Sequence, residues 1–365
     1  MTQHEITLLN LGGSLDDLAN LDPRGYGVCK LLYKAAREYT GMPLCVNSAL
    51  KLAQALDSGS LVYIMTGFVL HPFGKAETDG AVGAVLLARA LIKAFNAKPV
   101  IICPEECVNA LGDVAGSVGL GVSHSIEDVM KNPRSVGVIT FTKDRASAEA
   151  CADAIISRGV PDAVIAIECP GENAKGVYHN AKGVDVTHLE AKQDILFEKL
   201  RNMGVLNIAI GDLGNEIGMC AIGDYIKEKI PFAGDGACSC GCEGGICVRT
   251  KADNIITATV SDWGCYSLIA MLAYILETPD VMHDADIEKT ALEAAAKGGL
   301  IDMTGESIPA IDGFGTDIIL PIVTLMKELT VSALNLRESC KIWFEKTVEL
   351  KSFEEKPYGN KTQLN

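Results

Sequence analysis

The stretch LVYIMTG (Leu61–Gly67) is a short apolar run that ends in a glycine. It is followed by VGAVLLARALIKAF (Val82–Phe95), in which apolar residues recur at helical spacing, and then by a second apolar run, PVIIC (Pro99–Cys103). Two short apolar runs separated by an apolar helix are typical of a βαβ unit, whose parallel strands are buried on both faces. The stretch therefore predicts a parallel sheet.

The same alternation continues along the chain. Further strands are predicted at 136–141, 162–168, 205–211 and 254–261, and further helices at 146–159, 190–204 and 263–276. We therefore predict an α/β fold with a mostly parallel sheet of about six or more strands and helices on both faces. One α/β domain is predicted at 1–345, of which 1–50 form a helical lead-in, followed by a peripheral charged tail at 346–365.

The net charge of the 365-residue chain is −15. A field of this sign repels the phosphate backbone of nucleic acids and the surface of anionic lipid membranes. The longest apolar run, Tyr266–Leu276, is also shorter than the roughly 20 residues that a membrane-spanning helix needs. We therefore expect a small-molecule substrate as partner, with no nucleic acid and no membrane.

The chain has 13 cysteines. Its first residues, MTQHEITLLN, lack the basic segment and the apolar segment of a secretory signal peptide. Cysteines in a chain without such a signal stay reduced in the cytoplasm or bind metal. We therefore expect a cytoplasmic protein whose thiols are free or metal-bound.

Four predicted strand ends carry acids and glycines with little bulk. The segments that follow these strands contain HPFGKAETDG (71–80), CPGENAKGVYHNAKGVD (169–185), GDLGNEIG (211–218) and SDWG (261–264). In open α/β sheets, ligands bind beyond the carboxyl ends of the strands. We therefore expect one ligand site formed by these loops, in which Asp212 and Glu216 face a pocket shared with the ETDG turn (Glu77–Gly80).

The two acidic turns also have a simpler interpretation. In KAETDG (75–80), Asp79 or Thr78 is well placed to cap the helix that follows, and in GDLGNEIG the same holds for Asp212 or Asn215. GDLGNEIG has no Gly-Lys-Ser/Thr and no G-x-G-x-x-G spacing, so it matches neither common nucleotide-binding loop. We expect no nucleotide cofactor, and the sequence leaves helix capping and ligand binding open.

The segment CSCGCEGGIC (Cys238–Cys247), here called the cysteine loop, holds four cysteines within ten residues. Thiolates are the preferred ligands of zinc and of iron–sulfur centres. Cys238, Cys240, Cys242 and Cys247 are therefore predicted metal ligands, although their spacing is not that of a standard pair of C-x₂-C knuckles. The alternative is a glycine-rich surface loop of free thiols.

Several of these segments, taken in order, resemble the D-glutamate cyclase family. The resemblance rests on LDPRGYGVCKLLYKAAREYTGMPL (21–44), MTGF (65–68), ETDGAVGAVLLARAL (77–91), AIECPGENAKGVYHNAKGVDVT (166–187), AIGDLGNEIGM (209–219), VSDWGCYSL (260–268) and IDGF (311–314). It implies an α/β lyase that dehydrates glutamate to 5-oxoproline. The amine of the substrate would attack its own γ-carboxyl carbon, and water would leave.

Such a reaction needs a base, an acid or Lewis acid, and donors for the developing oxyanion. By the resemblance, Glu77, Asp79, Asp212 and Glu216 would act as bases or hold Mg²⁺ or Mn²⁺, glycine-rich amides would be the donors, and Tyr178 would act as an acid or a positioning hydroxyl. The predicted catalytic residues are Glu77, Asp79, Glu168, Tyr178, Asp212 and Glu216. The predicted substrate-binding residues are Gly67, Thr78, Gly80, Arg24, Asp185, Gly211, Gly214, Asn215, Ser261 and Trp263. A homo-oligomer is the assembly considered for this chain.

The chain departs from the family pattern at several positions. Cys169 and Glu172 stand where the family is expected to carry Arg, the natural clamp for a carboxylate. Leu213, Asp262 and Ala76 also differ from the expected Gly, Asn and Gly. These departures leave two alternatives to a glutamate cyclase. One is a divergent member that acts on a less acidic metabolite, and the other is a metal-binding or redox-sensing protein that uses the cysteine loop.

Overall fold

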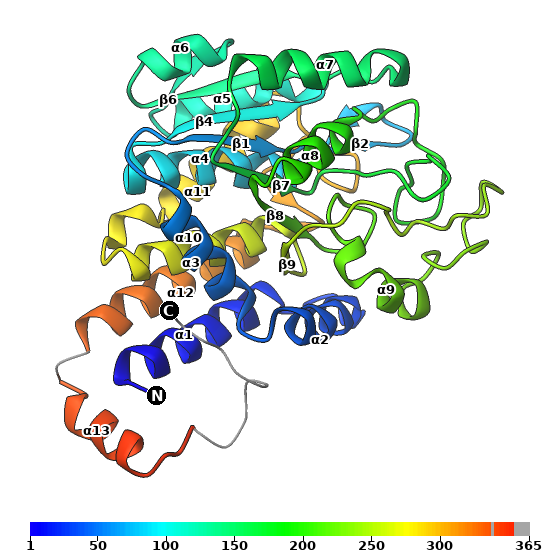
Figure 1. Cartoon of the computed structure of the whole chain (residues 1–365). Helices are drawn as coiled ribbons and strands as arrows, with labels where there is room; N and C mark the ends of the chain where they lie inside the picture. The colour runs from blue at the N-terminus through cyan, green and yellow to red at the C-terminus, as the bar shows by residue number, and fades with distance from the viewer. Residues whose placement is uncertain (337–338, 354–365) are drawn as a thin grey trace.

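The computed structural model of the chain describes residues 1–336 and 339–353 (Figure 1). Within them, a central sheet of seven strands has the order β5-β6-β4-β1-β7-β8-β9, and each neighbouring pair is parallel. Its strands are β1 (Leu61–Met65), β4 (Lys98–Cys103), β5 (Gly121–Ser123), β6 (Ser135–Thr140), β7 (Ala163–Ile167), β8 (Leu206–Gly211) and β9 (Asn254–Thr257). Two short antiparallel pairs are β2 (Val69–Leu70) with β3 (Lys75–Ala76), and β10 (Ala310–Ile311) with β11 (Phe314–Gly315). The predicted parallel α/β fold is confirmed.

Helices cover both faces of this sheet (Figure 1). One face carries α6 (Ile126–Lys131), α7 (Arg145–Arg158) and α8 (Gln193–Asn202). The other face carries α3 (Leu44–Ala55), α4 (Ala81–Phe95), α5 (Val108–Ser117) and α10 (Ser261–Ile275). The remaining helices are α1 (Gln3–Ala19), α2 (Val28–Thr40), α9 (Gly223–Lys229), α11 (Ala285–Lys297), α12 (Thr316–Asn335) and α13 (Lys341–Glu349). Right-handed crossovers between parallel strands account for this division of the helices.

The core is built from aliphatic strands and one central helix. Every residue of β1 and β7 is buried, as expected for parallel strands with helices on both sides. In α10, all residues from Ser261 to Tyr274 are buried, because this helix packs against α1, α3, α4 and α12. Each fully buried Val, Leu or Ile side chain contributes about 1.5–3 kcal/mol to stability. This core holds the strand ends in fixed positions.

The strand order reverses next to β1. The chain passes from β1 through α4 to β4 on one side, and later returns through α7 to β7 on the other side of β1. In doubly wound sheets, ligands bind in the crevice beyond the carboxyl ends of the strands at such a switch point. The loops that follow β1 and β7 contain the ETDG turn and Glu168, so the topology brings two of the predicted acidic segments to this place.

A few element boundaries differ from the predicted ones. The last predicted strand, 254–261, ends at Thr257, because Ser261 already begins α10. The strand β5 was not predicted, since three residues give no usable periodicity. Helix α13 extends across the predicted start of the tail at 346, and the part of that tail from 354 to 365 lies outside the described residues. None of the helices that the structure describes combines the length and hydropathy needed to cross a bilayer.

Candidate active site

A cavity of about 490 Å³ opens beyond the carboxyl ends of the central strands. Its walls come from segments 22–29, 68–77, 180–184 and 212–215, with Glu168, Thr259, Met303 and Asp312. We call it the acidic cavity, because Glu77, Glu168, Asp212 and Asp312 all line it. Of the predicted site residues, Arg24, Glu77, Glu168, Asp212 and Asn215 line it directly.

The carboxylates form two groups that share Asp212. Oxygens of Asp79, Asp212 and Asp312 all lie within 4.8 Å of one another. The same limit holds for oxygens of Glu168, Asp212 and Glu216. The ETDG and GDLGNEIG turns therefore meet, and Asp212 is the residue at which the two acidic groups join.

Asp79 lies behind the cavity wall and ties the loop after β1 to the start of α10. Its Oδ1 accepts hydrogen bonds from the backbone N–H groups of Gly80 (2.9 Å) and Asp262 (2.8 Å), and its Oδ2 accepts one from Ser261 (3.0 Å). Asp262 does the same for α4, since its Oδ1 accepts from the N–H groups of Gly80 and Gly83, both at 2.9 Å. The prediction that Asp79 or Thr78 caps the helix that follows them, α4, is therefore wrong. Asp79 binds the first N–H groups of α10, and Asp262 binds those at the start of α4.

The carboxylate of Glu216 binds the backbone of its own turn. Its Oε1 accepts from the N–H groups of Asp212 (2.9 Å) and Leu213 (2.7 Å), and its Oε2 accepts from that of Gly214 (2.6 Å). The glycine-rich amides of this turn therefore bind a protein carboxylate and are not the free oxyanion donors that the resemblance suggested. The Glu216 carboxylate also leaves no room for a side chain at position 211. A Cβ on Gly211 would lie 2.9 Å from the carboxyl carbon of Glu216.

Three cavity acids have pKa values well above their usual range. For Glu77, Glu168 and Asp212, burial is the largest cause, followed by the negative charge of Asp312, Glu216 and Glu168, respectively. Oε2 of Glu168 accepts a hydrogen bond from the hydroxyl of Ser261 at 2.6 Å. Asp212 is half-buried, and no described residue donates a hydrogen bond to its carboxylate. Asp212 is therefore the acid with oxygens most available to a ligand.

Backbone strain marks two of these acids. Glu168 has a φ of +43° and Asp312 a φ of +57°, in the left-handed region that non-glycine residues seldom adopt. Such conformations cost on the order of 1–3 kcal/mol each and concentrate at functional sites. Asp312 was not predicted as a site residue, and its only sequence signal is the IDGF segment of the family resemblance.

The crowded acids predict an unusual dependence of stability on pH. Burial, and then the charge of Asp312, raise the pKa of Asp79 from 3.8 to about 8. The folded protein keeps this proton up to about pH 8, whereas the unfolded chain releases it near 3.8, so the free energy of unfolding falls as pH rises between these values. We expect metal-free protein to be less stable at pH 8 than at pH 6 in urea unfolding with chelator present. Equal or greater stability at pH 8 would contradict this.

Two cations face the acidic cavity, Arg24 and Lys182. The Nη2 of Arg24 lies 3.0 Å from Oδ2 of Asp312, and the guanidinium stacks 4.7 Å above the ring of Phe314. Within the described part of the chain, the hydrogen bonds of Arg24 all use Nη2. Its other donors are therefore available for a substrate carboxylate. Lys75, Arg89 and Lys175 do not line the cavity.

The structure places four predicted site residues elsewhere. Tyr178 is fully buried and donates its hydroxyl to Asp194, away from the cavity. Trp263 lies in the core against Phe314, at a ring distance of 5.2 Å. Asp185 is exposed, and Gly67 is a packing position, since a Cβ there would lie 2.5 Å from Pro104. Thr78 is buried beside the acids, and its hydroxyl has no partner among the described residues.

The two positions that lack the expected arginines do not face the cavity. Cys169 is completely buried. Glu172 is also buried, and its carboxylate binds Arg145 and Arg249, with distances of 3.0 Å from Arg145 Nη2 and 2.7 Å from Arg249 Nε. The missing arginines therefore do not reduce the positive charge of the cavity. They give no reason to prefer a less acidic substrate.

The cysteine loop differs from its prediction in one ligand. Sulfurs of Cys238, Cys240 and Cys242 lie together with a ring nitrogen of His179, all within 4.8 Å of one another. Cys247 is not part of this group. Its buried Sγ contacts the carbonyl oxygens of Gly223 and Val248 at 3.8 and 3.6 Å.

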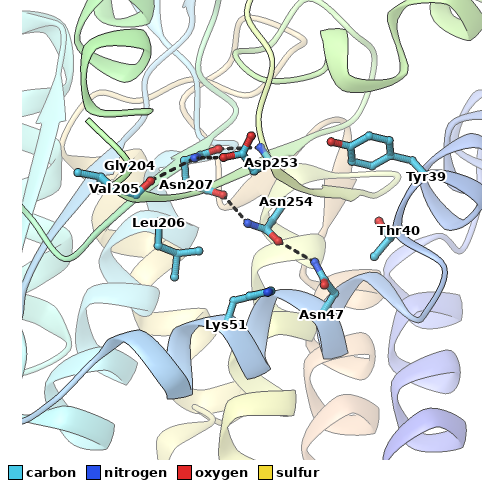
Figure 2. A pocket seen from close by; sticks show the side chains of 10 residues that line it. All are labelled: Tyr39, Thr40, Asn47, Lys51, Gly204, Val205, Leu206, Asn207, Asp253 and Asn254. Carbon is cyan, nitrogen blue, oxygen red and sulfur yellow. Dashed lines mark hydrogen bonds between the residues drawn. The ribbon is translucent and has the colours of Figure 1, made fainter. Parts of the chain in front are cut away.

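A second hollow, of about 690 Å³, lies at the opposite edge of the sheet, at the amino ends of β8 and β9 (Figure 2). Its polar side chains bind mainly one another and the strand backbones. Asn47 donates to Asn254 (2.9 Å), Asn254 to the carbonyl of Asn207 (2.9 Å), and Asn207 to Asp253 (2.7 Å). These bonds hold the strand starts together, so we place the candidate active site in the acidic cavity.

The family model described as "D-glutamate cyclase-like, C-terminal" matches residues 15–327. The chain belongs to this family. The human mitochondrial D-glutamate cyclase is 28% identical over 293 residues, which are 78% of this chain and 42% of the human protein. The chain thus spans less than half the length of that relative. Membership supports an enzyme of broadly lyase or cyclase type, and the matched region contains the whole lining of the acidic cavity.

The donor set of the acidic cavity fits a hard divalent cation. Carboxylate oxygens are the ligands that Mg²⁺ and Mn²⁺ prefer. Asp212, Asp312 and Glu168 all line the cavity, and Asp212 belongs to both acidic groups. A bound cation would also offset the repulsion that, after burial, raises the pKa values of Glu168 and Asp212. We expect Mg²⁺ or Mn²⁺ to raise the unfolding temperature at pH 8 more than at pH 6.

Proposed function

We propose that the chain cyclises D-glutamate, or a closely related amino acid, to 5-oxo-D-proline with loss of water. The observation that carries this proposal is the convergence of Glu77, Glu168, Asp212 and Asp312 beside Arg24 in one cavity. Family membership and the human D-glutamate cyclase support the choice of substrate. Cytoplasmic location and a possible homo-oligomer remain expectations, which cell fractionation and sedimentation would test.

The reaction moves two protons from nitrogen to oxygen. The substrate ammonium must lose two protons, its nitrogen must bond to the γ-carboxyl carbon, and one γ-oxygen must leave as water. Asp212, the least buried of the three acids with a raised pKa, would in its ionised form act as the base that receives a proton from nitrogen. Glu77 and Glu168, whose raised pKa values favour the protonated form, would each donate one proton to the departing oxygen. The two protons that leave nitrogen would restore them, one directly and one by way of Asp212.

The basic side chains and the wall of the cavity would orient the substrate. Arg24 would bind the α-carboxylate through its free donors, and its contacts with Asp312 and Phe314 fix its position. Holding nitrogen and carbon close together supplies much of the rate in ring closure. A divalent cation held by Asp212 and Asp312 would add polarisation of the γ-carboxyl group.

The direct test is incubation of the purified chain with D-glutamate, with L-glutamate in parallel. We expect 5-oxoproline, measured by chromatography, to form from D-glutamate and to increase with added Mg²⁺ or Mn²⁺. An enzyme that makes no 5-oxoproline from D-glutamate under any of these conditions would overturn the glutamate version of the proposal.

Replacing Arg24 by Lys tests the carboxylate clamp. Lysine keeps the charge and loses the planar fork, so a pair of charge-assisted hydrogen bonds becomes a single contact. We expect KM for D-glutamate to rise about 10- to 100-fold, with a smaller change in kcat. Lys75→Met is the matched control, because Lys75 is exposed and outside the cavity. A KM within twofold of wild type for Arg24→Lys would exclude this role.

A further inference from the structure

Three sulfurs and one nitrogen meet where the cysteine loop crosses the segment 179–185. Sγ of Cys238 lies 3.4 Å from that of Cys242 and 3.7 Å from that of Cys240. Nε2 of His179 lies 3.2 Å from Sγ of Cys240 and 3.6 Å from Sγ of Cys242. These four atoms come from segments about sixty residues apart.

The spacing of these atoms matches a tetrahedral zinc site. With Zn–S bonds of about 2.3 Å and a Zn–N bond of about 2.0–2.1 Å, tetrahedral angles place two sulfurs about 3.8 Å apart and a sulfur about 3.5 Å from the nitrogen. The four distances in the structure lie close to these values. An iron–sulfur cluster would hold its thiolates further apart, because several metal ions and sulfides would separate them.

We propose that Cys238, Cys240, Cys242 and His179 bind one Zn²⁺ in a closed, structural site. The set is Cys₃His, one of the common structural combinations. It replaces the four-cysteine set that spacing alone suggested, because Cys247 packs against carbonyl oxygens of its own and neighbouring segments. The assignment does not depend on the proposed cyclase activity.

The surroundings of the site support thiolate ligands. Sγ of Cys242 accepts hydrogen bonds from the side-chain amide of Asn173 and from the backbone N–H of Gly244, both at 3.4 Å. The same Asn173 amide donates to the carbonyl of Gly245 at 2.7 Å, which fixes its orientation. N–H donors to a ligand sulfur stabilise its negative charge and orient the ligand. His179 is 1% exposed, so its ring enters the site from the protein side.

A metal here would hold the wall of the acidic cavity. Ser239 donates to the carbonyl of Gly183 through both its N–H group (3.1 Å) and its hydroxyl (2.9 Å). Between the ligand His179 and Gly183 lie Asn180, Ala181 and Lys182, which line the cavity. The backbone carbonyl of His179 also accepts the side-chain amide of Asn215 at 3.0 Å. The zinc would therefore stabilise the loop that carries Lys182 and contacts the GDLGNEIG turn.

Metal analysis of protein purified under reducing conditions without added metal tests the proposal. We expect about one zinc per chain by mass spectrometry, and loss of most of it in Cys238→Ser and Cys242→Ser. Cys247→Ser is the matched control from the same loop, and it should keep its zinc. Protein reconstituted with Co²⁺ should show the visible bands of a tetrahedral site and a strong sulfur-to-cobalt charge-transfer band.

Three results would overturn the assignment. The first is wild-type protein that contains little zinc and also fails to bind Co²⁺ in a tetrahedral thiolate site. The second is bound iron with the absorption spectrum of an iron–sulfur cluster. The third is a loss of zinc in Cys247→Ser as large as that in Cys238→Ser. These readouts need no substrate. A failed cyclase assay with one zinc per chain would leave the metal site established and remove only the proposed reaction.

Discussion

Asp212→Asn is expected to lower kcat for cyclisation by about 10²–10⁴-fold and, in metal-free protein, to raise the unfolding temperature by on the order of a few degrees. Activity falls because the amide cannot take the proton from nitrogen and is a poorer cation ligand. Stability rises because the variant removes a carboxyl group that burial and four neighbouring acids disfavour in its charged form. No described residue donates to that carboxylate, so the change breaks no internal hydrogen bond of the side chain.

Glu216→Gln provides the contrast within the same acidic group. Glu216 accepts three backbone N–H groups, and a glutamine amide would point an NH₂ group at one or more of them. A buried N–H group without a partner costs about 1–3 kcal/mol, so this variant should be less stable than wild type. Asp113→Asn, an exposed change on α5, should alter neither property. Melting curves with chelator and initial rates with Mg²⁺ or Mn²⁺ give both quantities. A destabilised Asp212→Asn would show that Asp212 holds the fold.

The part of this structure that local sequence patterns predict is the part with regular repeats. Apolar runs such as Leu61–Gly67 and Val205–Gly211 are strands because parallel strands are buried on both faces, and glycine ends them. The acids of ETDG and GDLGNEIG were predicted to meet because the carboxyl ends of parallel strands share one edge. Helix capping was also predicted, but not that Asp79 and Asp262 each cap the helix of the other segment. That exchange joins residues about 180 positions apart.

In the irregular loops, side-chain direction was not predictable. Tyr178 and His179 are consecutive residues that both form β-bridges, so their side chains point in opposite directions. Tyr178 therefore enters a small apolar cluster with Phe68 and Val186, while His179 reaches the cysteine loop. By the family resemblance, Tyr178 was predicted to lie in the site, and His179 was not among the predicted metal ligands. Only the three-dimensional path of two distant loops shows which of the two residues joins the sulfurs.

Gly83→Ala should be destabilised by about 2–4 kcal/mol, although alanine is the best helix former. A Cβ at Gly83 would lie 2.3 Å from Oδ1 of Asp262. That oxygen accepts the N–H groups of Gly80 and Gly83, and Asp262 is fully buried, so it cannot move into solvent. Gly112→Ala in α5 is the matched control. Its Cβ would meet nothing within 4 Å, so this helix should gain up to about 1 kcal/mol.

A double-mutant cycle with Asp262→Ala separates steric conflict from helix propensity. If the conflict with the Asp262 carboxylate causes the loss, Gly83→Ala should cost much less when residue 262 is already alanine, with a coupling energy of about 1–3 kcal/mol. The free energies come from urea unfolding of the four proteins. Additive effects would mean that α4 tolerates the methyl group by shifting. In that case, the hydrogen bonds that Asp79 and Asp262 make to α10 and α4 would not determine the position of Asp79 beside Asp212. The core contacts of α10 alone would determine it.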